Sequence, residues 1–114
     1  MSENTLFQKI IAREIPAAIL YEDESCIAFT DINPQAPLHA LVVPIKPIPK
    51  IIDATAADEP LLGHLMAVAA QIAREAGYGD GFRLVINNGA DAGQSVFHVH
   101  IHVLAGRLLQ WPPG

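Results

Sequence analysis

Apolar residues recur along the chain either at helical spacing or in short runs between polar turns. Thr5 and Gln8 have the spacing of a capping box, and the apolar residues after them follow a helical period. Asp58 and Gly77 are typical of the N-cap and the C′ position of a second, longer helix. The whole pattern predicts a helix ending before Pro16, a hairpin of strands at 19–21 and 26–31, a strand at 39–44, a helix at 58–77, and strands at 82–87 and 95–104.

These elements predict an α+β fold in one domain, with an antiparallel sheet of about five strands and two helices. The run 39–44 is continuously apolar, as in a central strand buried on both faces. Prolines 44, 47 and 49 exclude regular structure just after it. A chain of 114 residues can bury about 65% of its unfolded surface, so we expect a single domain over 1–114 with a C-terminal tail at 105–114.

The charge balance limits the class of partner. Twelve acidic and seven basic residues give a net charge of −5, and lysine and arginine form no cluster, so we expect no nucleic-acid partner. A single phosphate can still be held by backbone N–H groups, hydroxyls and imidazoles. Cys26 is the only cysteine, the first residues lack the pattern of a secretion signal, and no apolar run approaches the roughly 20 residues of a membrane span. We therefore expect a cytoplasmic protein without a membrane partner.

Three of the five histidines, His98, His100 and His102, stand at every second position of the segment HVHIH. In a strand they would share one face, spaced by roughly 6 to 7 Å, with Val99 and Ile101 on the other face. Three interpretations remain open on this pattern: a metal site, a nucleophilic or acid/base site, and a polar strand face that is hydrogen-bonded to its neighbours.

Strand geometry disfavours the metal interpretation. Imidazoles are good zinc ligands, but residues i and i+4 of one strand lie roughly 13 Å apart, so the three histidines cannot readily share an ion. Cys26, His39 or His64 could add a ligand, yet the paired spacing of a structural zinc site is missing. We expect neither a metal nor a cofactor.

The glycine-containing loop before the histidines favours phosphoryl chemistry. By itself the loop 87–95 is a simple hairpin connection without the lysine of a P-loop, although its glycines let backbone N–H groups face an anion. Next to the histidine row, it suits nucleophilic attack by His100 on phosphorus, with Ser95 and Asn87 donating hydrogen bonds to phosphoryl oxygens. An imidazole with a pKa near 6.5 could protonate a leaving amine.

The segment GQSVFHVHIHVL at 93–104 resembles the signature of the histidine-triad (HIT) superfamily. The segments TLFQKIIAREIP, FTDINPQAPLHALVVP, LLGHLM and WPPG resemble its Hint branch. The resemblance implies a homodimeric purine nucleoside phosphoramidase, which hydrolyses a P–N bond through a nucleotidyl-histidine intermediate. The chain departs from the pattern at Pro47, where many relatives have a histidine. Two alternatives stay open: a dinucleoside polyphosphate hydrolase, which shares the triad, and a nucleotide- or zinc-binding interaction module.

The resemblance also implies a role for each site residue. His100 would be the nucleophile, and His102 would contact the phosphate and leaving group. His98 and His39 would orient and tune the nucleophile, and Ser95 would complete the catalytic set. The implied nucleotide-binding positions are Asp31 for the ribose hydroxyls, Ile32 beside the nucleoside, the base-pocket residues Leu6, Phe7, Ile10 and Phe29, the phosphate-binding residues Asn87, Gly93, Gln94 and Ser95, and Trp111 in a tail that reaches the partner subunit's site. Without the resemblance, Phe7, Ile10 and Phe29 are core candidates and His64 is a helix-surface residue.

Overall fold

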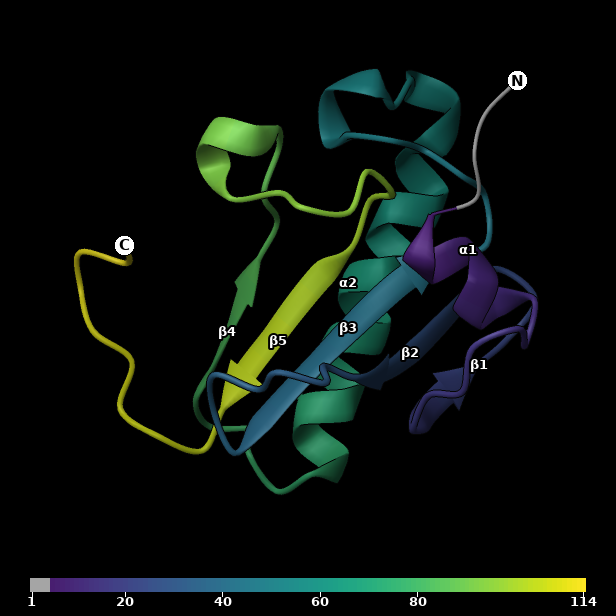
Figure 1. Cartoon of the computed structure of the whole chain (residues 1–114). Coiled ribbons are helices and arrows are strands. Elements are labelled where there is room, and N and C mark those ends of the chain that lie inside the picture. Colours follow the sequence, from purple (N-terminus) through teal and green to yellow (C-terminus); the bar gives the residue numbers. More distant parts are fainter. Residues whose placement is uncertain (1–4) are drawn as a thin grey trace.

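The computed structural model describes residues 5–114, and its elements follow the predicted order (Figure 1). Helix α1 (Leu6–Ile11) precedes strands β1 (Ile19–Glu22), β2 (Cys26–Thr30) and β3 (Leu38–Pro44). The 3-10 helices η1 (Ile51–Asp53) and η2 (Ala56–Asp58) lead into α2 (Glu59–Glu75), and β4 (Phe82–Val85), the 3-10 helix η3 (Ala90–Ala92) and β5 (Ile101–Ala105) follow. Residues 1–4 lie outside the described residues. They belong to the N-terminal segment whose sequence lacks the pattern of a secretion signal.

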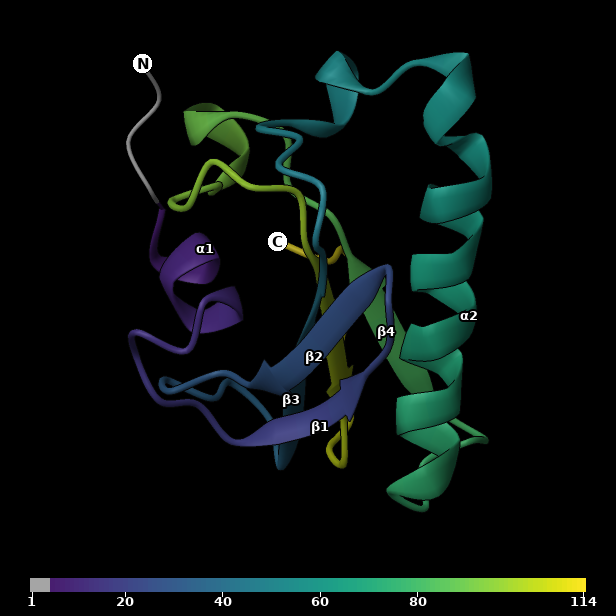
Figure 2. The same ribbon diagram turned by 90° about the vertical axis from the view of Figure 1, so that its right-hand side faces the viewer.

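The five strands form one antiparallel sheet in the order β1-β2-β3-β5-β4. Helix α2 runs along one face of the sheet, and the short helix α1 lies on the other face (Figure 2). The predicted α+β class, with five strands and two helices, is confirmed. None of the helices in residues 5–114 is both long and apolar enough to cross a bilayer.

The two helices create two separate apolar clusters, one on each face. Helix α2 buries a stripe at three- and four-residue spacing, as expected for an amphipathic helix; the stripe consists of Leu65, Val68, Ala69, Ile72 and Ala73. On the other face, Phe7 and Ile10 of α1 pack against side chains of β2 and β3. Strand β3 is buried on both faces, which confirms the prediction from its continuous apolar run.

Strand β5 begins at Ile101, so the prediction of a strand from Ser95 is wrong for its first six residues. The antiparallel register pairs Val42 with Ile101, and its continuation would place Pro44 opposite Val99. Because proline has no N–H, the ladder stops there. The Val99 N–H bonds to the Ile48 carbonyl at 2.7 Å instead, where the chain has already left the sheet.

Helix α2 starts directly after Asp58, the predicted N-cap residue, but the carboxylate of Asp58 has a different role from the expected one. Asp58 precedes the helix, but its carboxylate caps nothing in α2. It forms a capping box with Thr55 at the start of η2, and it accepts a hydrogen bond from Lys46 Nζ at 2.5 Å. The helical turn therefore starts three residues earlier than the apolar period indicates. Gly77 has a φ of 91°, as predicted for the C′ position.

Candidate active site

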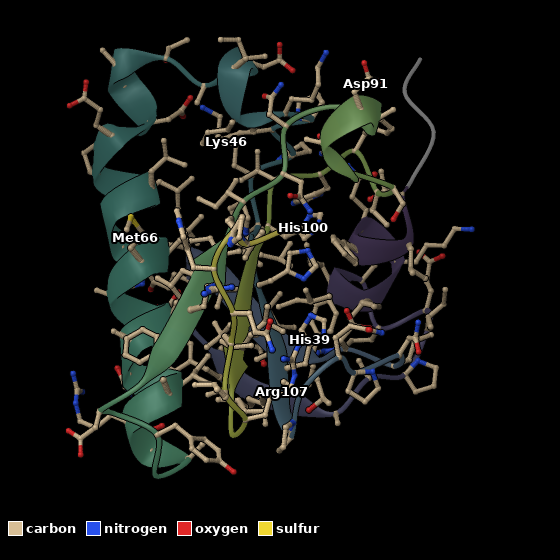
Figure 3. All side chains as sticks on the ribbon, turned by 90° about the vertical axis from the view of Figure 1, so that its left-hand side faces the viewer. His39, Lys46, Met66, Asp91, His100 and Arg107 are labelled. Carbon is tan, nitrogen blue, oxygen red and sulfur yellow. The ribbon has the colours of Figure 1, made fainter. Side chains whose placement is uncertain are left out.

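The histidine row faces α1, as the alternation predicts. The ring of Phe7 contacts the ring of His100 edge-on, with centroids 4.8 Å apart, and the rings of His100 and His102 lie 5.0 Å apart. Val99 and Ile101 point the other way, into the cluster under α2. Figure 3 shows His100 and His39 in the space between the sheet and α1. The alternation of the side chains thus survives before β5, although the chain bends at 96–98 and has no ladder partner there.

His100 is 93% buried, and one of its nitrogens is fixed by the backbone. Its Nδ1 lies 2.7 Å from the carbonyl oxygen of His98, and a carbonyl can only accept, so Nδ1 carries the proton. Nε2 then holds the lone pair. Burial lowers the pKa of His100, although the bond to the His98 carbonyl and the charge of Asp31 partly oppose this effect. The side chain is therefore a neutral nucleophile at neutral pH.

His102 belongs to a chain of hydrogen bonds that fixes its tautomer. The Gln35 N–H donates to Nδ1 of His39 at 3.0 Å, so the proton of His39 must be on Nε2. That Nε2 lies 2.9 Å from Nδ1 of His102, which must accept, and the remaining proton of His102 is on Nε2. Burial, followed by the nearby His100 and His39, lowers the pKa of His102 to about 4. These hydrogen bonds leave His102 neutral, with its Nε2–H available to donate to a bound ligand.

His39 therefore contacts His102, whereas the sequence assigned it with His98 to tuning the nucleophile. His39 is also buried in β3, the middle strand of the sheet. Its Nε2 lies 3.4 Å from the carboxylate of Asp31. The ligand atoms of Asp31, His39 and His102 lie within 4.8 Å of one another, so a cation at this place would use one triad histidine and two upstream residues.

His98 is the most deeply buried histidine of the row. Its Nε2 donates to the Pro44 carbonyl at 2.7 Å, and its Nδ1 has no hydrogen-bond partner in the described part of the chain. Burial, the largest effect, lowers its pKa. His98 thus has a positioning role. Its carbonyl orients the ring of His100, while its own ring is hydrogen-bonded to Pro44 at the end of β3.

An apolar pocket of about 230 Å³ opens beside the histidines. Its walls include all six residues that the sequence assigned to the nucleoside, Leu6, Phe7, Ile10, Phe29, Asp31 and Ile32. Ser95 and His102 also line it. Sequence reasoning missed the further lining residues Ile15, Pro16, Ala17, Thr30, Leu41 and Val96. Phe7 and Phe29 belong to the apolar cluster under α1 and also line the pocket, because the pocket borders that cluster.

The loop 87–95 engages the side chain of one of its four assigned phosphate ligands, Gln94, inside the protein. Ser95 is exposed and lines the pocket, and Asn87 is half-buried with Nδ2 near the backbone of Gly93. Gln94 is buried, and its amide accepts from Gly89 N–H and donates to the carbonyls of Pro49 and Val96. Both amide protons of Gln94 are therefore used inside the protein, and its side chain holds the loop. Gly93, at a φ of 103°, allows the turn that follows η3.

Trp111 lies away from this pocket. Its side chain is 81% exposed, and the guanidinium of Arg83 in β4 donates to the carbonyl of the preceding Gln110 at 2.9 Å. Figure 1 shows this C-terminal segment beyond β4, which is the edge strand opposite β1. The tail does not reach the site of its own chain.

Two contributors to the site act through the backbone and leave no signal in the sequence. The Gln35 N–H fixes the tautomer of His39, and the Pro44 carbonyl anchors His98. Side-chain type says nothing about either role. The proximity of these positions to a histidine follows only from the strand register.

Comparison with known proteins defines the class of this chain. The HIT domain family model matches residues 12–109, so the chain belongs to the HIT family. An uncharacterized HIT-like protein of Synechocystis is 60% identical over the whole length of both chains, and a 14 kDa zinc-binding protein of Zea mays is 48% identical over 96% of this chain and 88% of its own length. The crystal structure of a HIT family hydrolase from Legionella pneumophila covers 97% of this chain and 100% of its own, with 45% identity and a TM-score of 0.95.

Proposed function

We propose that this protein is a hydrolase of the Hint branch, a purine nucleoside phosphoramidase. It would convert nucleoside 5′-phosphoramidates to a nucleoside monophosphate and an amine. The hydrogen bond from His100 Nδ1 to the His98 carbonyl carries this proposal, because it leaves the Nε2 lone pair free for attack on phosphorus. Hydrolase names among similar structures support the reaction class.

In the first step, Nε2 of His100 forms a bond to phosphorus and the P–N bond breaks. His102 donates from Nε2 to a phosphoryl oxygen or to the leaving nitrogen and stabilises the developing charge. Each neutral imidazole in the chain from His39 to His102 carries one proton, so full transfer from His102 would create an imidazolate. The tautomers therefore favour solvent as the source of the amine's proton. Water then attacks phosphorus, the bond to His100 breaks, and one proton returns to solvent.

The pocket supports a nucleoside as the bound group. Its apolar walls suit the flat face of a base, and the carboxylate of Asp31 at its rim can accept from ribose hydroxyls. Ser95 and Asn87 would donate to the phosphate, together with backbone N–H groups of the loop at Gly93. We assign Gln94 to this group through its backbone, because its side-chain protons are already used.

We also propose that the chain acts as a homodimer in the cytoplasm. Trp111 is exposed, and it follows Gln110, whose carbonyl accepts from Arg83 of β4, so a second copy would bring it to a nucleotide site. The small-residue helix at 61–76 offers a close-packed surface for such a contact. Sedimentation of the purified protein tests the dimer, and a monomer at all concentrations would refute it.

Intact-mass analysis tests the reaction. The protein is mixed with an adenosine phosphoramidate and quenched in base, with and without EDTA, and we expect an adenylyl adduct and amine release in both cases. Absence of both would refute the phosphoramidase. Loss on EDTA treatment would show a metal-dependent reaction instead, and faster turnover of a dinucleoside polyphosphate would favour that branch.

Two substitutions separate the nucleophile from the donor. His100→Ala should give no adduct, whereas His102→Asn should give the same adduct more slowly. Ser95→Ala should lower turnover more than nucleotide affinity, because a donor aimed at developing charge acts mainly in the transition state. An adduct in His100→Ala would place the nucleophile elsewhere.

A further inference from the structure

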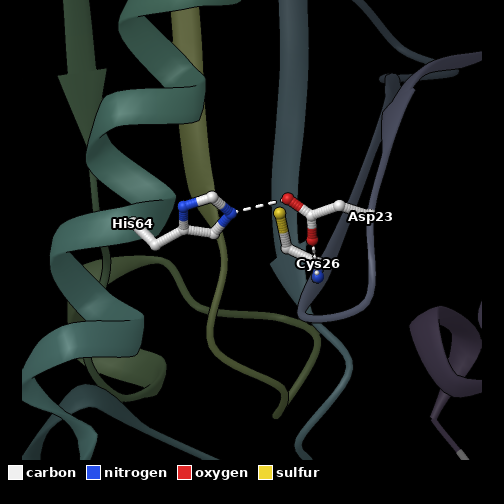
Figure 4. A group of neighbouring side chains, drawn as sticks. All are labelled: Asp23, Cys26 and His64. Atoms are coloured by element: carbon white, nitrogen blue, oxygen red, sulfur yellow. Dashed lines mark hydrogen bonds and ion pairs between the residues drawn. The ribbon is translucent and has the colours of Figure 1, made fainter.

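A second group of chemically competent side chains lies on the opposite face of the sheet, under α2. Asp23 belongs to the turn between β1 and β2, Cys26 is the first residue of β2, and His64 comes from α2 (Figure 4). The carboxylate, the thiol sulfur and an imidazole nitrogen lie within 4.8 Å of one another. None of the three takes part in the histidine site.

The carboxylate of Asp23 is held in place by four hydrogen bonds. Its Oδ1 accepts from the N–H groups of Ser25 and Cys26 at 2.8 and 2.9 Å. Its Oδ2 accepts from the Tyr21 hydroxyl at 2.8 Å and lies 2.6 Å from Nε2 of His64. Burial would raise the pKa of Asp23, but the bonds from His64 and Tyr21 outweigh it and keep the pKa well below its usual range. The carboxylate is thus ionised and oriented before any ligand arrives.

We propose that Asp23, Cys26 and His64 bind one divalent cation of the zinc class. The donor set of one sulfur, one nitrogen and one oxygen suits this borderline-soft ion, whereas calcium and magnesium prefer oxygen ligands alone. Cys26 is fully buried, while the side chain of His64 is 40% exposed. The site is therefore closed to solvent at Cys26 and accessible to solvent at His64. Water would fill the fourth position on that side.

The three side chains need only small movements to reach tetrahedral geometry. Ligand atoms about 2.0 to 2.3 Å from zinc lie roughly 3.3 to 3.7 Å from one another. The contact between His64 and Asp23 must therefore open from 2.6 Å, and the widest pair must close from at most 4.8 Å. His64 can make this movement because its ring lies at the surface. The Tyr21 hydroxyl remains as an outer partner that orients the carboxylate.

Binding also requires a rearrangement of protons. The thiol of Cys26 loses its proton to solvent and coordinates as the thiolate, and His64 coordinates through an Nε2 that carries no proton. Burial, together with the charge of Asp23, raises the pKa of Cys26 to about 12 in the protein without a cation. The thiol of Cys26 therefore releases one proton to the buffer for each cation bound near neutral pH.

Cobalt(II) spectroscopy tests the site directly. Cobalt replaces zinc in tetrahedral sites, and a cobalt–thiolate bond gives a charge-transfer absorption in the near ultraviolet. Cys26 is the only cysteine in the chain, so this absorption can arise from no other side chain. We expect it to saturate at one cobalt per chain and to disappear when zinc is added.

Three variants locate the ligands. Cys26→Ala should abolish the absorption, and His64→Gln, a change at a partly exposed position, should raise the cobalt midpoint at least tenfold. His39→Gln removes a ligand from the other metal-capable group and should leave the absorption unchanged. Absence of the absorption at millimolar cobalt, or an unchanged midpoint in His64→Gln, would overturn the proposal. Phosphoramidase activity does not enter the measurement, so its outcome is independent of the proposed function.

Discussion

Nε2 of His39 lies 2.9 Å from Nδ1 of His102, although 63 positions separate the two residues in the chain. The register of β3 and β5 pairs Leu41 with His102 and His39 with Leu104, so the two imidazoles are diagonal neighbours on one face. The contact places a buried donor directly behind the histidine that would meet the substrate.

We expect His39→Ala to lower kcat roughly 10- to 100-fold, the equivalent of about 1 to 3 kcal/mol for a lost buried hydrogen bond. KM should change little, because His39 does not line the pocket. Steady-state kinetics and the yield of the His100 adduct check this expectation. An unaltered kcat, or an effect on KM alone, would contradict the positioning role.

The acid limb of the pH–rate profile should lie below pH 6.5. His100 reacts through an unprotonated Nε2, so activity falls as the pH drops through its pKa, and burial lowers this pKa from the ordinary 6.5. The measurement is kcat/KM for a phosphoramidate between pH 4 and 8. A limb at or above pH 6.5 would show that His100 is not buried as neutral imidazole.

The free energy of unfolding should decrease as the pH falls below about 6.5. Burial lowers the pKa of His39, His98, His100 and His102, so the unfolded chain takes up protons first. The contribution is fully present above the unfolded pKa and is lost on the acid side, with a slope of up to about 1.4 kcal/mol per pH unit for each histidine. Urea unfolding at pH 7.0 and 5.0 measures it, and equal stabilities would be inconsistent with burial of the row.

Gln94→Ala should destabilise the protein by about 2 to 3 kcal/mol. The change leaves the Gly89 N–H and the carbonyls of Pro49 and Val96 without their partner. Ser95→Ala, next to it in an exposed position, serves as the control and should leave stability nearly unchanged. If Gln94→Ala weakened only nucleotide binding, its side chain would be a ligand after all.

Gly106→Ala should destabilise the protein by more than about 2 kcal/mol. Gly106 has a φ of 98°, and an added Cβ would lie 2.7 Å from the Cβ of Pro37. Gly63→Ala is the matched control, since Gly63 is exposed in α2 and a Cβ there meets nothing within 4 Å. That variant should gain about 0.5 to 1 kcal/mol from helix propensity. Thermal unfolding of both proteins gives the comparison.

Local patterns predicted most elements and the composition of the pocket. Apolar periodicity located both helices and all strands, and the six residues assigned to the nucleoside do line one cavity. The start of β5 could not be predicted, because it depends on Pro44 in another strand lying opposite Val99. The role of Gln94 was equally hidden, since its hydrogen-bond partners include Pro49, 45 residues away.

The sequence by itself determined that three imidazoles share one face, because residues at every second position of a strand point to the same side. Only the tertiary structure decided how they differ. The His98 carbonyl fixes the proton of His100, Gln35 and His39 fix that of His102, and Asp23, Cys26 and His64 meet under α2. Hydrogen bonds between distant segments depend on strand register and helix packing, which no local spacing encodes.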